Sequence, residues 1–176
     1  MPSDQPAIVA GKSVQWSVKP VGRTRHALLK IRDRKQRDVM ICDLPPNVKC
    51  LFPKENLEFA GSISENEAKT LKEVFAKHST FDEIGEMIEA VEAKSPELSK
   101  RMRDVLAKNC SRLNDLTPAA VDYSKKCIHF VTNVMCNLTL GKQLTFDEAD
   151  KLHKAFKELS TEDQAALKKK NPDVNF

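Results

Sequence analysis

The stretch from residue 94 to residue 138 constrains the fold most, because it predicts two long helices joined by a short connector. Ser95 and Pro96 mark the start of the first helix, since serine can cap free N–H groups and proline fits the first helical position. Thr117 and Pro118 repeat this signal at the start of the second helix. The sequence therefore predicts two antiparallel helices, each about 30 Å long at about 1.5 Å per residue.

Both helices carry an apolar face. Apolar side chains recur every three or four residues, which places them on one side of a helix, and the second helix is expected to stop near Gly141. The apolar positions are Leu98, Met102, Val105, Leu106 and Leu113 in the first helix, and Val121, Ile128, Val131, Val134, Met135 and Leu138 in the second.

Shorter helices are predicted on both sides of this pair. Residues 64–67, 80–83 and 145–148 have the capping-box pattern of serine or threonine followed three residues later by glutamate, and Ser160 is expected to cap a last short helix. Counting from Ser64, the chain contains six predicted helices. The short helices cannot cover the long pair along its length, so the gap is filled either by side chains or by a ligand. Periodicity does not separate these alternatives.

The amino-terminal segment, residues 1–43, differs from the rest. The chain carries a net charge of +4, yet residues 12–37 hold nine Lys or Arg and one acidic residue. Val14, Trp16 and Val18 alternate with polar residues, as in a half-exposed strand. Such a basic arm can contact nucleic acid or an anionic membrane surface. The alternative is a solvated, loosely ordered extension, favoured because Trp16 is the single residue there that offers a stacking surface for bases.

The sequence offers no catalytic or metal-binding constellation. Five cysteines form no CxxC pair, and the four histidines have no HExxH spacing, so neither a disulfide framework nor a metal site is predicted. A GxSxG elbow and a glycine-rich phosphate loop are also missing. No apolar run approaches the roughly 20 residues of a membrane span, and the amino terminus does not resemble a secretory signal. We therefore predict a non-catalytic protein without a cofactor, cytoplasmic if the sequence is taken literally.

Several motifs resemble those of the nematode fatty acid and retinol-binding proteins, over residues 44 to 176. The most specific is Lys-Ser-Pro-Glu-Leu at 94–98, within its helical context. The others are Leu-Pro-Pro-Asn-Val at 44–48, Leu-Lys-Glu-Val at 71–74, Ala-Lys-His at 76–78 with Phe81, Leu113, Leu116, Pro118 and Ala119, and Leu159, Ser160, Leu167 and Pro172.

The resemblance implies an all-α fold, an irregular wedge-shaped bundle of about six to eight helices around a large apolar cavity that holds a fatty acid or retinol. The helical domain would span residues 44–176, with residues 1–43 as a basic extension. Three methionines in the predicted lining suit tails of differing shape, because methionine is flexible and unbranched. The lining residues implied are Leu71, Phe75, Ile84, Met87, Ile88, Val91, Met102, Val105, Leu106, Ile128, Val131, Met135, Leu152 and Phe156.

On this interpretation the partners are fatty acids and retinol, the protein is a monomer that binds no metal, and it contacts membrane surfaces transiently. Members of the family are typically secreted, whereas this chain begins with the basic segment. The alternative function is a helical interaction protein whose basic amino-terminal arm contacts nucleic acid or acidic partners. Salt-sensitive nucleic-acid binding that disappears when residues 1–43 are deleted would distinguish it from a lipid carrier.

Overall fold

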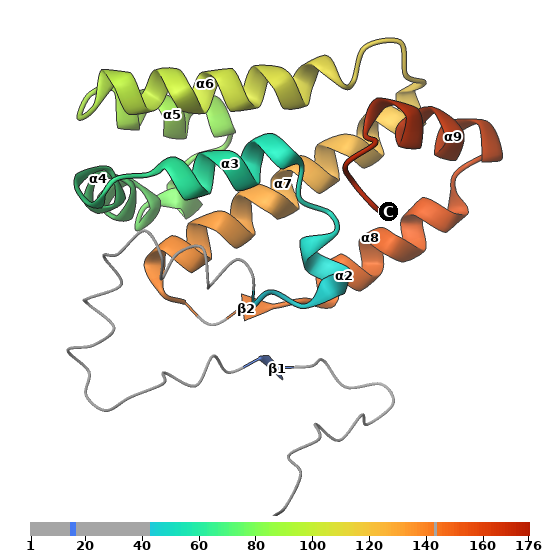
Figure 1. The fold of residues 1–176 in the computed structure, drawn as a ribbon, viewed down its shortest axis with the longest axis horizontal. Helices are drawn as coiled ribbons and strands as arrows, with labels where there is room; N and C mark the ends of the chain where they lie inside the picture. Colours follow the sequence, from blue (N-terminus) through green and yellow to red (C-terminus); the bar gives the residue numbers. More distant parts are fainter. Residues whose placement is uncertain (1–14, 17–42, 143) are drawn as a thin grey trace, which may run out of the picture.

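A computed structural model describes residues 15–16, 43–142 and 144–176. In this part of the chain eight α-helices surround a core, and the strands are limited to one two-stranded pair (Figure 1). The helices are α2 (Pro46–Lys49), α3 (Lys54–Ser62), α4 (Glu65–Phe75), α5 (Ile84–Glu92), α6 (Pro96–Ser111), α7 (Pro118–Leu140), α8 (Asp147–Glu158) and α9 (Thr161–Lys170), with a 3-10 turn, η2, at His78–Thr80. The expected all-α class of six to eight helices is confirmed.

The two long helices begin where the sequence predicts. Pro96 and Pro118 are the first residues of α6 and α7. Thr117 caps α7, because its Oγ1 accepts a hydrogen bond from the backbone N–H of Ala120 at 3.2 Å. Ser95 occupies the N-cap position of α6 but makes no side-chain cap. Helix α7 ends at Gly141, whose φ of 66° is readily adopted only by a residue without a Cβ.

Helices α6 and α7 diverge from their connector (Figure 1). Helix α6 packs mainly against α5 and α3, whereas α7 packs mainly against α4 and α8. The long pair therefore does not form one continuous seam, and the space between the two helices is shared with side chains from α3, α4 and α5.

The capping predictions were correct in part. At the start of α4, Ser64 donates its N–H to Glu67 Oε2 at 2.7 Å and Ser64 Oγ accepts the Glu67 N–H, which completes the predicted capping box. Ser160 caps α9 as expected. The boxes at 80–83 and 145–148 were wrong: the threonine of the first ends η2, and that of the second lies in strand β2 (Leu144–Thr145).

Helix α3 was not predicted. In the sequence, Pro53 indicates only that a helix beginning at Pro46 ends within two turns, because proline breaks a helix interior. In the structure Pro53 immediately precedes the first residue of α3, where its missing N–H leaves no helical hydrogen bond unmade. Pro53 thus separates α2 from α3 and marks the start of α3.

The core consists of two clusters of buried apolar side chains. The first joins α2, α8, α9 and most of α7, and includes Val48, Phe130 and Leu167. The second joins α4, α5 and α6, and includes Leu71 and Leu98. Helix α7 is shared, because its middle belongs to the first cluster, Cys136 near its end belongs to the second, and Met135 packs against both.

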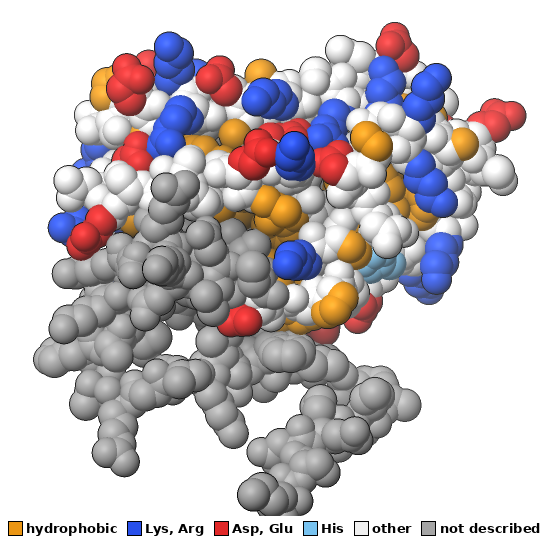
Figure 2. Space-filling model, viewed as in Figure 1, with side chains coloured by type: hydrophobic (Ala, Val, Ile, Leu, Met, Phe, Trp, Pro, Cys, Tyr) orange, Lys and Arg blue, Asp and Glu red, His pale blue; other side chains and the backbone are white. Residues whose placement is uncertain are grey.

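A short strand connects the amino-terminal segment to the helical body. Strand β1 (Gln15–Trp16) pairs antiparallel with β2, with Trp16 opposite Leu144. The expected strand around Trp16 is present at these two residues. Val14, Val18 and all nine basic residues of the segment 12–37 lie outside the described residues. On the face drawn in Figure 2, positive and negative side chains of the helical body are interspersed. Among the helices described, none is long and apolar enough to cross a membrane.

Candidate functional site

An apolar cavity of about 60 Å³, which we call the α6–α7 cavity, lies where five helices converge. Its lining residues are Asn56 and Phe59 from α3, Phe75 from α4, Ile84, Met87 and Ile88 from α5, Met102, Val105, Leu106 and Asn109 from α6, and Ile128, Thr132, Met135 and Cys136 from α7.

The structure brings nine of the fourteen predicted lining residues together around this cavity: Phe75, Ile84, Met87, Ile88, Met102, Val105, Leu106, Ile128 and Met135. Leu71 and Val91 belong to the same apolar cluster behind the lining. Val131 lines a second cavity, whereas Leu152 and Phe156 lie in the other cluster. The Phe156 ring stacks on Phe176 at a centroid distance of 5.0 Å. As ligand contacts, all fourteen residues remain predictions.

Five lining residues were missed by the sequence reasoning: Asn56, Phe59, Asn109, Thr132 and Cys136. The first two lie on α3, a helix that was not predicted. Asn109 carries a signal that was available, because it follows Met102, Val105 and Leu106 by seven, four and three residues and so shares their helical face. A polar residue at such a position is buried with the apolar stripe and needs a partner there.

The lining contains a short chain of polar contacts. Asn109 Nδ2 donates to Asn56 Oδ1 at 3.0 Å, and Asn56 Nδ2 lies 3.9 Å from the sulfur of Met135. Thr132 donates its hydroxyl to the backbone oxygen of Ile128 at 2.9 Å. Burial raises the pKa of the Cys136 thiol to about 12, so this group is neutral at physiological pH. The described part of the lining therefore carries no charge.

A second cavity of about 30 Å³ lies beside the first, against the carboxy-terminal residues. We call it the C-terminal cavity. Asn109 and Ile128 line both cavities and thus stand between them. The remaining lining consists of Leu51, Pro53, Arg112, Leu113, Ser124, Cys127, Val131, Asn171, Val174 and Phe176.

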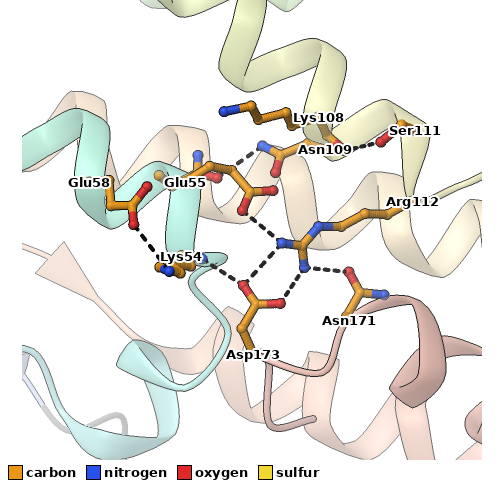
Figure 3. Close-up of polar contacts among 10 residues, drawn as sticks. Lys54, Glu55, Glu58, Lys108, Asn109, Ser111, Arg112, Asn171 and Asp173 are labelled. Carbon is orange, nitrogen blue, oxygen red and sulfur yellow. Dashed lines mark hydrogen bonds and ion pairs between the residues drawn. The ribbon is translucent and has the colours of Figure 1, made fainter.

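Arg112 lines the C-terminal cavity. A cluster of ion pairs and hydrogen bonds holds its side chain (Figure 3). Its guanidinium donates to Glu55 Oε2 at 2.7 Å, to the two oxygens of Asp173 at 2.6 and 3.0 Å, and to Asn171 Oδ1 at 3.2 Å. Asp173 also accepts the backbone N–H of Lys54 at 2.7 Å. The cluster thus ties the start of α3 and the end of α6 to the segment that follows α9.

The Arg112 cluster predicts a loss of stability in acid. The hydrogen bonds from Arg112 lower the pKa of Asp173 to about 2. Because this pKa is depressed in the folded state, its contribution is present above the ordinary aspartate value of about 4 and is lost as the pH falls toward 2. We expect urea unfolding to show a falling unfolding free energy over this interval. This decrease of the unfolding free energy with falling pH should be smaller in Asp173→Asn, whose side chain cannot titrate. An equal decrease in this variant would mean that Asp173 is not the group responsible.

The family described as nematode fatty acid retinoid binding protein (Gp-FAR-1) matches residues 47–175. This chain belongs to that family. No curated protein matches the sequence significantly. The match covers all helices from α3 to α9 and most of α2, and it agrees with the resemblance drawn from the motifs between residues 44 and 176.

Two solved structures of the fatty acid and retinoid binding family are similar to this chain. The lipid binding protein Ce-FAR-7 from Caenorhabditis elegans is 52% identical, with a TM-score of 0.71, over 77% of this chain and 96% of that one. The fatty acid and retinol binding protein Na-FAR-1 from Necator americanus is 27% identical, with a TM-score of 0.64, over 76% of this chain and 88% of that one. Both likenesses extend over most of the helical body.

The α6–α7 cavity is small in this conformation. Its volume of about 60 Å³ is below the roughly 300–1,000 Å³ of typical small-molecule sites, and so below the large cavity that the resemblance implies. Long, flexible side chains line it, Met87, Met102 and Met135 among them. An incoming tail must displace these side chains.

Proposed function

We propose that this protein binds and carries long-chain fatty acids and retinoids, without catalysis, in an expanded form of the α6–α7 cavity. The observation that carries the proposal is family membership over residues 47–175, with a structural relative named as a fatty acid and retinol binding protein. The uncharged, mainly apolar lining of the cavity supports it, because a hydrocarbon tail gains free energy wherever it leaves water.

The energetics of tail burial allow the cavity to expand. Each buried methylene contributes about 0.8 kcal/mol, so a tail of about 16 carbons contributes on the order of 10 kcal/mol before the costs of association and ordering. Expansion separates side chains of α5, α6 and α7, but the ligand restores apolar contact to each of them. The three lining methionines reduce the cost, since an unbranched thioether fits many shapes of neighbour.

The test is displacement of a fluorescent fatty acid. Purified protein should bind the probe saturably, and unlabelled fatty acid and retinol should each displace it. Folding is verified on the same sample from the helical far-ultraviolet circular dichroism signal. Absence of saturable binding by folded protein would refute the proposal. A monomeric state and transient contact with membrane surfaces remain predictions that the same preparation can test.

A further inference from the structure

One polar atom in the wall of the α6–α7 cavity has no partner. Asn109 is 6% exposed, and its side-chain oxygen, Oδ1, makes no hydrogen bond within the described residues. A buried carbonyl oxygen without a donor is costly, because it has lost water and gained nothing in return. Asn109 lines both cavities, so a bound molecule in either can supply the missing donor.

The contact with Met135 indicates how the amides of Asn56 and Asn109 are oriented. A thioether sulfur can only accept a hydrogen bond, so the Asn56 side chain presents its NH₂ group to Met135. The oxygen of Asn56 consequently faces Asn109 and takes the Asn109 NH₂ group. In this arrangement the Asn109 oxygen, Oδ1, accepts no hydrogen bond from the described residues.

The other polar groups of the α6–α7 cavity wall each make at least one hydrogen bond, although the NH₂ groups of Asn56 and Asn109 each keep a second N–H. Thr132 donates to Ile128, and the Cys136 thiol donates to the sulfur of Met87 at 3.9 Å. Among the described residues that line this cavity there is no lysine, arginine or histidine. A carboxylate that entered would therefore meet an unpaired carbonyl oxygen and no cation.

Arg112, which lines the neighbouring C-terminal cavity, does not provide a free cation for the carboxylate of a ligand. Arg112 is paired with both Glu55 and Asp173, so the two carboxylates outnumber the guanidinium. A third carboxylate on the ligand would compete with Asp173 and Glu55 for the same donors. An alcohol brings no charge and adds the donor that Asn109 lacks.

We propose that Asn109 is an internal headgroup site that accepts a hydrogen bond from the hydroxyl of a long-chain or isoprenoid alcohol and disfavours a carboxylate. This inference rests on the proposed lipid-binding function and assigns the residue that sets headgroup preference. Alcohols bind with the hydroxyl inside, against Asn109. Fatty acids bind with the tail inside and the carboxylate at the surface.

Three retinoids with one carbon skeleton test the proposal in the unaltered protein. Retinol carries a hydroxyl donor, retinal has an oxygen that only accepts, and retinoic acid is a carboxylate at neutral pH. We expect retinol to bind about tenfold more tightly than retinal, the upper range for one neutral hydrogen bond, and more tightly than retinoic acid. Equal affinities for retinol and retinal would overturn the proposal.

The variant Asn109→Leu tests whether this residue causes the preference for retinol over retinal. Leucine is close to asparagine in size and has no acceptor, so the ratio of retinol to retinal affinity should fall to within about twofold. Thr132→Val is the matched control, since it removes another polar group from the same wall, and it should keep the ratio. A ratio that survives Asn109→Leu, or that is lost in Thr132→Val instead, would overturn the assignment.

Two controls distinguish a failure of the Asn109 proposal from misfolding of the variant and from a failure of the proposed lipid-binding function. Asn109→Leu leaves Asn56 Oδ1 without its donor, so the double variant Asn56→Leu, Asn109→Leu removes both amides and should fold where the single one does not. If neither variant folds, the retinoid comparison in the unaltered protein decides. If no retinoid or fatty acid binds saturably, the proposed function itself fails; if all bind equally, only the role of Asn109 fails.

Discussion

Replacing Arg112 by leucine is expected to lower the free energy of unfolding by about 3–5 kcal/mol, the largest stability effect we predict. The side chain of Arg112 is 18% exposed and that of Glu55 is 11% exposed, so water reaches neither group well. Without the guanidinium, Glu55 keeps a buried charge with no partner, and Asp173 no longer holds the carboxy-terminal segment to α6. Urea unfolding followed by circular dichroism measures the change.

An exposed arginine supplies the control. Arg103 pairs with Glu92 on the surface, where the side chains are 48% and 52% exposed, so Arg103→Leu should cost no more than about 1 kcal/mol. The double variant Glu55→Leu, Arg112→Leu should recover part of the loss, because it removes the unpaired charge as well. If the two arginine variants lost the same stability, burial of the Arg112 cluster would not be the cause.

The sequence was sufficient to locate elements whose signals are local. Helices α6 and α7 each combine a proline at the first position with an apolar repeat, and these features depend on neighbouring residues alone. The same reasoning failed at α3, since Pro53 can end one helix or begin another and local pattern does not say which. It failed again at Thr80, which has the right spacing for a cap but closes a 3-10 turn.

The site depended on information that local pattern does not contain. Periodicity shows which face of α6 is apolar, but it does not show whether that face meets a side chain or a void. The Arg112 cluster joins residues 57 and 61 positions apart, and nothing at Arg112 itself indicates these partners. Asn109 lies between these cases: its position on the apolar face is visible in the sequence, whereas its missing partner is visible only in the structure.

Replacing Val105 by tryptophan is expected to lower the affinity for both fatty acids and retinol at least about tenfold. Val105 is a half-buried residue of α6 that lines the α6–α7 cavity, so the indole enters the space that the ligand tail needs. Excluding only two methylenes, at about 0.8 kcal/mol each, already weakens binding about tenfold. Fluorescent fatty acid displacement, with retinol as a second competitor, measures the loss.

Val121→Trp is the matched control for this variant. Val121 lies near the start of α7, partly exposed, and lines neither cavity, so the same change of side chain there should leave lipid affinity within about twofold. Val105 is half-buried and lines a cavity that is only partly empty, so the helical circular dichroism signal of Val105→Trp is measured first to verify that the variant folds without strain from overpacking. Equal losses in the two variants would mean that the tail binds elsewhere. A loss confined to Val105→Trp would place the tail between α6 and α7, where the helices diverge and leave the core incompletely filled.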